Sequence, residues 1–118
     1  MKNTELRIGN YVTFTDETNT IVAISPADFA REFHKGYHFD GYEPIPLTEE
    51  WLVKFGFERR QHQQGMHFKY HTVWIGNNRN GRCFILKRTH GRRIRRVKHV
   101  HQLQNLYFAI TCEELTTK

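Results

Sequence analysis

The sequence predicts an α+β fold rich in antiparallel strands, with a short central helix and an amphipathic C-terminal helix. Three observations support this fold class. Short apolar or alternating runs, separated by turn residues, fill most of the chain, which is typical of antiparallel strands. Residues 48–55 begin at a capping residue and end at a glycine, and residues 100–110 carry apolar side chains at helical spacing. The length of 118 residues fits one domain, residues 1–118.

The first half of the chain is expected to form three strands. Residues 7–14 alternate apolar and polar side chains, residues 20–25 are rich in β-branched residues, and residues 37–43 have an extended pattern. These strands are compatible with a small SH3-like half-barrel. Residues 27–36 are ambiguous, although their two phenylalanines lie four apart, which suits one helical turn.

The central helix has the clearest local signals. Thr48 can cap the free amides of the first turn, and the two glutamates after it lie at the positive end of the helix dipole. Leu47 and Leu52 are spaced to form a hydrophobic staple across that end. Gly56 is the expected stop.

The second half of the chain is expected to form an antiparallel meander. Residues 66–71 alternate, whereas residues 73–75 and 83–86 are short apolar runs typical of buried strands. Residues 92–98 are a candidate edge strand whose alternation is imperfect at Ile94.

The C-terminal helix is expected to cover this meander. We expect Leu103, Leu106 and Tyr107 to be buried, and Gln102 and Asn105 to be exposed. The predicted apolar face consists of Val100, Leu103, Leu106, Tyr107 and Ile110.

Charge is divided unevenly along the chain. The net charge is +6, but residues 1–58 carry five basic and ten acidic side chains and sum to −5. Residues 59–112 carry twelve basic side chains and no acid, and residues 113–118 sum to −1. A surface that serves only solubility usually mixes both signs. The segment 59–112 is therefore expected to attract a polyanion or the acidic face of a protein.

Arginine is the most frequent residue in the basic stretch. Its planar guanidinium donates two parallel hydrogen bonds to a phosphate, and the nearby rings of Phe68, Tyr70 and Trp74 are candidates for stacking on exposed bases. Nucleic acid, an acidic protein surface, and a solvated basic strand without a partner all remain open. The candidate contact residues are Arg79, Arg82, Lys87, Arg88, Arg92, Arg93, Arg95, Arg96 and Lys98.

Histidines and carboxylates give little support for an enzyme. His99 and His101 match the histidine pair of metal-dependent endonucleases, with Tyr107 as the nucleophile, but in a helix their side chains would diverge by about 200°. In a strand, His67 and His71 would lie about 13 Å apart, too far for one metal. No phosphate-binding loop, dinucleotide fingerprint or serine-hydrolase elbow is present. We expect no catalytic residue, no metal and no cofactor.

The cysteines and the hydropathy of the sequence indicate in which cellular compartment the protein is expected. Cys83 and Cys112 belong to no CxxC pair, so free thiols in a reducing compartment are expected. No run of 18 apolar residues occurs, and the N-terminal residues lack an apolar signal core. We therefore expect a cytoplasmic protein with no membrane partner.

Three segments of the chain resemble a family of short proteins from Bacteroides-type bacteria and their prophages. They are Glu5–Val12, Pro44–Leu52 and Val100–Ala109, so the resemblance spans the chain. It implies a phage or mobile-element setting and carries over no activity and no site residue. The chain departs from the family pattern at Cys112, where such proteins tend to have glycine, and at 87–98, which is usually less basic.

These observations favour a non-enzymatic binding module of phage or mobile-element origin that contacts nucleic acid through its basic surface. The alternative is a protein-interaction factor, such as an inhibitor of a host system or a structural accessory, that uses the same surface on an acidic partner.

Overall fold

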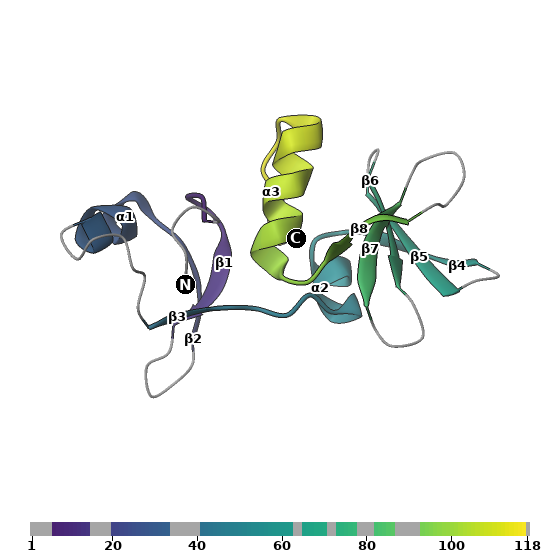
Figure 1. Cartoon of the computed structure of the whole chain (residues 1–118), viewed down its shortest axis with the longest axis horizontal. Helices are drawn as coiled ribbons and strands as arrows, with labels where there is room; N and C mark the ends of the chain where they lie inside the picture. The colour runs from purple at the N-terminus through teal and green to yellow at the C-terminus, as the bar shows by residue number, and fades with distance from the viewer. Residues whose placement is uncertain are drawn as a thin grey trace.

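The chain folds into two antiparallel sheets with a helix between them (Figure 1). The principal extents are 49 × 30 × 24 Å, and the molecule is elongated because the sheets lie at opposite ends of its long axis. The computed structural model describes residues 6–14, 20–33, 41–62, 65–70, 73–77, 82–86 and 93–117.

The N-terminal sheet contains a strand within or overlapping each predicted range, but the first begins at Tyr11 rather than at residue 7, and residues 37–40 of the third prediction lie outside the described residues. The three strands pair antiparallel in the order β2-β1-β3, and the likeness to an SH3 half-barrel stays a prediction. Their buried side chains form a small core of Leu6, Val12, Ile24 and Tyr42. The bounds are β1 Tyr11–Phe14, β2 Thr20–Ala23 and β3 Tyr42–Pro44.

The ambiguous segment between β2 and β3 contains a helix, α1, Pro26–Phe33. Its start is fixed by a reciprocal pair of hydrogen bonds. The amide of Asp28 donates to Ser25 Oγ at 3.2 Å, and the amide of Ser25 donates to Asp28 Oδ2 at 2.8 Å. Pro26 occupies the first turn, where its missing N–H does no harm. A serine, a proline and an acid three residues after the serine are thus the local signal for this helix.

The central helix matches its prediction. Helix α2 spans Glu49–Lys54, and Thr48 Oγ1 accepts from the amide of Trp51 at 3.5 Å. Leu47 and Leu52 are both buried in the main core, as a staple requires. Gly56 has φ +94°, a left-handed conformation that ends the helix at low cost.

The second sheet is a five-stranded meander in the order β4-β5-β6-β7-β8, antiparallel throughout. Strand β8 is an edge strand, as predicted. A C-terminal helix, α3, Val100–Thr111, follows it. The strand bounds are β4 Glu58–His62, β5 Gly65–Tyr70, β6 Val73–Asn77, β7 Cys83–Leu86 and β8 Arg93–Val97.

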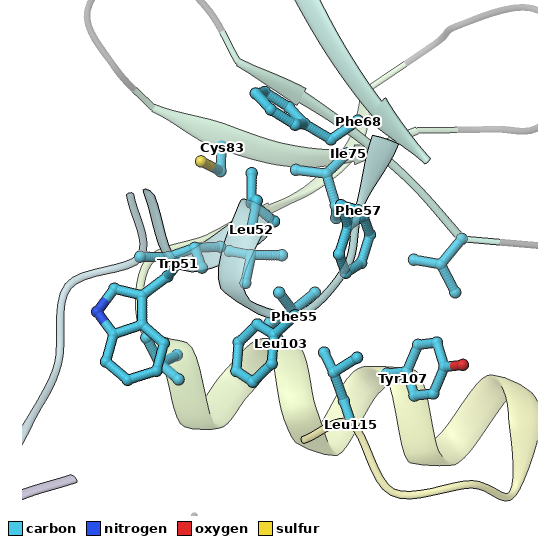
Figure 2. Packing of buried hydrophobic residues seen from close by; sticks show 14 of the residues in the cluster. Trp51, Leu52, Phe55, Phe57, Phe68, Ile75, Cys83, Leu103, Tyr107 and Leu115 are labelled. Atoms are coloured by element: carbon cyan, nitrogen blue, oxygen red, sulfur yellow. The ribbon is translucent and has the colours of Figure 1, made fainter. Parts of the chain in front are cut away.

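Helices α2 and α3 cover one face of this sheet and enclose the main core. Figure 2 shows sheet residues such as Phe68 and Ile75 above Leu52 of α2, with Leu103 and Tyr107 of α3 on the opposite side. All five are almost completely buried. The other face of the sheet, here called the outer face, points away from both helices (Figure 1).

Helix α3 is rotated relative to its predicted face. Leu103 and Tyr107 are buried as expected, but Leu106 is only half-buried and Ile110 is 48% exposed, so those two assignments are wrong. Their places are taken by His101 and Gln104, each 1% exposed. The rotation arises because α3 packs against both sheets and so buries more than one stripe.

Gln104 joins α3 to both ends of the chain. Its Nε2 donates to the carbonyls of Gly9 and Leu115, each at 3.1 Å, and its Oε1 accepts from the amide of Tyr11 at 2.8 Å. One buried amide therefore satisfies three backbone groups, of which the Leu115 carbonyl is fully buried and the other two are partly buried.

Gln102 and Asn105 are half-buried rather than exposed, so the sequence-based expectation is wrong for both. Gln102 Oε1 accepts from the amides of Lys98 and His99 at 3.0 and 3.1 Å, which secures the start of α3. Asn105 Oδ1 accepts from Asn10 Nδ2 at 2.9 Å. Both polar side chains lie against the protein because it offers them partners, backbone amides for Gln102 and the Asn10 side chain for Asn105.

Candidate nucleic-acid interface

The predicted contact residues fall into three groups. Arg82, Arg95, Arg96 and Lys98 are exposed. Arg93 lies in β8, where only its backbone is described. The remaining four lie outside the described residues; they are Arg79, Lys87, Arg88 and Arg92.

Strand β8 contains a bulge that explains its imperfect alternation. Ile85 pairs with Arg95 but Leu86 pairs with Arg93, so Ile94 is an extra residue and is 64% exposed. A bulge and several arginines on an edge strand both oppose pairing with a strand of another chain. The edge of β8 is therefore better suited to presenting charge than to extending the sheet.

A single row of paired residues crosses the outer face from one edge strand to the other. Residues paired directly across antiparallel strands point to the same face. The register places these residues side by side in the order Arg60, His67, Gly76, Phe84 and Arg96. Four strand spacings make the row about 19 Å long. It has a guanidinium at each end, with an imidazole and a phenyl ring between them.

The neighbouring positions continue this basic and aromatic character. The Nζ of Lys69 lies 5.2 Å from the centre of the Trp74 ring, and the two residues are paired across β5 and β6. The Leu86 side chain fills the space above Gly76, since a Cβ there would lie 3.0 Å from it. The outer face thus carries basic side chains beside the half-buried rings of Phe84 and Trp74.

Only one of the three aromatic residues proposed for base stacking lies on this face. Phe68 is completely buried in the main core, and Tyr70 stacks on Tyr107 with ring centres 5.7 Å apart. Trp74 is half-buried on the outer face. Phe84 is not among the residues predicted to stack on bases, because it lies in the apolar run 83–86 that was expected to be buried. Strict alternation from the buried Cys83 places the Phe84 ring on the outer face.

Some acids of the described residues form ion pairs, and one of these pairs joins Arg60, at one end of the row, to Glu58 at 3.2 Å. Arg7, Arg31, Lys54, Arg59 and Arg60 each lie within 4.0 Å of a carboxylate oxygen. In the same part of the chain, Arg95, Arg96 and Lys98 form no ion pair. The acids of the described residues therefore do not neutralise these three side chains by direct contact.

The histidine pair has a different geometry from the one expected for a helix. His99 has extended dihedrals as the N-cap of α3, so its ring stacks on His101 with centres 5.7 Å apart and planes 10° apart. The expected divergence is wrong for this reason. Tyr107, the residue matched to a nucleophile, is buried between α3 and the sheet. His71 lies outside the described residues, within which no three His, Cys, Asp or Glu side chains come together as a possible metal site.

The two cysteines should differ sharply in reactivity. Burial, with the nearby Glu49 carboxylate acting in the same direction and Arg96 opposing it, raises the pKa of the Cys83 thiol to about 11, whereas Cys112 is exposed. In the folded protein at pH 8, Ellman's reagent should therefore titrate one thiol rapidly and the second only after unfolding. Rapid release of two equivalents from protein with a native circular dichroism spectrum would contradict the burial of Cys83.

The chain matches no family model, no curated protein and no solved structure in the comparisons made. Every helix within the described residues falls short of the length and apolar character needed to cross a membrane. Fold and geometry together define the class as an α+β protein with a basic, partly aromatic sheet face.

Proposed function

We propose that this protein is a non-enzymatic module that binds single-stranded nucleic acid on the outer face of its five-stranded sheet. The observation that carries the proposal is the row from Arg60 to Arg96, which has a guanidinium at each end of the sheet and an imidazole and a phenyl ring between them. We also propose the phage or mobile-element setting, which rests on the sequence resemblance alone.

The chemistry of the row suits an unpaired strand better than a duplex. Phosphates attract arginine and lysine, and each base has a flat face that stacks on an aromatic ring regardless of its identity. The rings of Phe84 and Trp74 lie beside Arg96 and Lys69 on the outer face, so a strand can contact charge and ring together. Bases inside a duplex do not offer these flat faces.

The alternative occupant, an acidic protein surface, would be held by charge but would not need the rings. Both partners would dissociate with added salt, because exposed charges are screened. Sensitivity to loss of an aromatic ring therefore separates the two.

The test is fluorescence anisotropy with a labelled oligodeoxythymidine over a series of salt concentrations. Four basic side chains near the row, Arg60, Lys69, Arg96 and Lys98, predict a log–log slope of about −3 for a single strand. Arg96→Ala should weaken binding about tenfold and flatten the slope by about 0.7. Phe84→Leu, which keeps an apolar side chain but removes the ring, should weaken binding without changing the slope.

Lys54→Ala is the matched control. It removes one positive charge from α2, where Lys54 lies within 3.8 Å of Glu50, and should leave affinity and slope unchanged. Equal losses in Lys54→Ala and Arg96→Ala would mean that net charge alone drives binding. Absence of binding by folded protein at low salt would refute the proposal, and normal binding by Phe84→Leu would favour the acidic-protein alternative.

A further inference from the structure

Strand β8 and the first two turns of α3 enclose a partly open cavity of about 220 Å³ at the edge of the five-stranded sheet. Arg95 and Arg96 line it from the strand, and His101 and Gln102 line it from the helix. It is separate from the outer face except at Arg96, which belongs to both. The cavity therefore begins where the row ends.

The electrostatics of this cavity favour an anion. The Arg95 side chain lies on the side of the sheet that holds the cavity, because its pairing partner Ile85 is buried on that side, and it forms no ion pair with a carboxylate of the described residues. The sequence contains no acid between residues 59 and 112, so every side chain lining the cavity is basic or uncharged. The N-terminal half of α3 adds the positive end of its dipole.

The remaining lining residues restrict what kind of anion fits. Gln102 Oε1 already accepts two backbone hydrogen bonds, which fixes the amide and leaves its NH₂ group as a donor. Val97 and Leu106 supply an apolar wall. With about 30 Å³ per water in the liquid, the cavity has room for about seven waters, which is more than a phosphate alone occupies. A phosphate joined to a sugar uses the charge, the donor and the apolar wall together.

We propose that this cavity binds the terminal phosphorylated nucleotide of a nucleic-acid strand, with Arg95 holding the phosphate. The inference deepens the proposed function and rests on it, because a strand lying along the row ends at Arg96, which precedes Val97 of the cavity wall and follows Arg95 in β8. Arg95 contacts the terminal phosphate only, whereas Arg96 contacts the strand on the outer face.

The experiment compares oligodeoxythymidine with a phosphate at the 5′ end, at the 3′ end or at neither, each labelled at the end away from the phosphate. One terminal phosphate should strengthen binding about tenfold, which corresponds to about 1.4 kcal/mol. Arg95→Ala should abolish this advantage and leave binding of the unphosphorylated strand within about twofold. Lys69→Ala, which changes the outer face beside the row and not the cavity, should weaken all three strands by the same factor. Equal binding of all three strands by the unaltered protein, or an advantage that persists in Arg95→Ala, would overturn the inference.

A second measurement keeps the cavity testable if no strand binds and the proposed function fails. Thymidine monophosphate is titrated into the full chain while the amide resonances of β8 and α3 are followed. Saturable shifts near Arg95 and His101, lost in Arg95→Ala, would support a nucleotide site on their own. No shift, or equal affinity for inorganic phosphate or a phosphoserine peptide, would overturn the assignment to a nucleotide.

Discussion

Replacing Gln104 by alanine is expected to lower the free energy of unfolding by about 3–5 kcal/mol. The side chain is 1% exposed and makes three hydrogen bonds to backbone groups of Gly9, Tyr11 and Leu115. Each backbone group left buried without its partner costs about 1–3 kcal/mol, since water cannot replace the lost amide. The loss is large because one substitution removes three partners at once.

Chemical denaturation followed by circular dichroism measures this loss. Gln102→Ala is the matched control, because it removes the same side chain from the same helix at a half-buried position where water can reach the freed amides. That control should lose only about 1 kcal/mol, the usual contribution of a helix cap. Similar losses in the two variants would show that the contacts of Gln104 contribute no more than an ordinary cap.

Leu103→Ala should destabilise the protein by about 3–5 kcal/mol. Leu103 is 0% exposed and belongs to the main core, where α3 faces the sheet (Figure 2). Truncation of a fully buried leucine loses its transfer free energy and leaves a cavity that the surroundings fill only in part. Leu106→Ala, at a half-buried position, should lower the free energy of unfolding by less, about 1–2 kcal/mol.

Ile110→Ala is the control for this pair, because it truncates an apolar side chain of the same helix that is 48% exposed. Its loss should stay below about 1 kcal/mol. The expected order is Leu103, then Leu106, then Ile110. A larger loss at Ile110 than at Leu103 would restore the apolar face predicted from sequence spacing and contradict the observed orientation of α3.

The parts of the fold that depend on local signals could be predicted from the sequence. Helix α2 needs only Thr48 at its start and Gly56 at its end, and both act within one turn. The orientation of α3 could not be predicted in this way. Apolar spacing selects Ile110 and passes over Gln104, whose burial depends on Gly9 and Tyr11, more than 90 residues away in the chain.

The same distinction applies to the candidate site. The excess of positive charge is evident from composition, and Arg96 and Lys98 are exposed as a basic surface requires. The row across the sheet depends on strand register, which brings Arg60 and Arg96 onto one face from opposite edges. Sequence proximity instead suggested Phe68, which the alternation directs into the core.

The hydrogen bonds of Gln104 also constrain the order in which the protein is built. The groups that they join are 93 and 95 residues apart for Tyr11 and Gly9, so the N-terminal sheet meets its support only after the intervening chain has been synthesised. Contacts of such long range are slow to form, since the intervening chain must first be ordered or looped out. Strands β1 to β3 therefore leave the ribosome before the helix that supports them. Docking of the first sheet against α3 must follow the synthesis of α3.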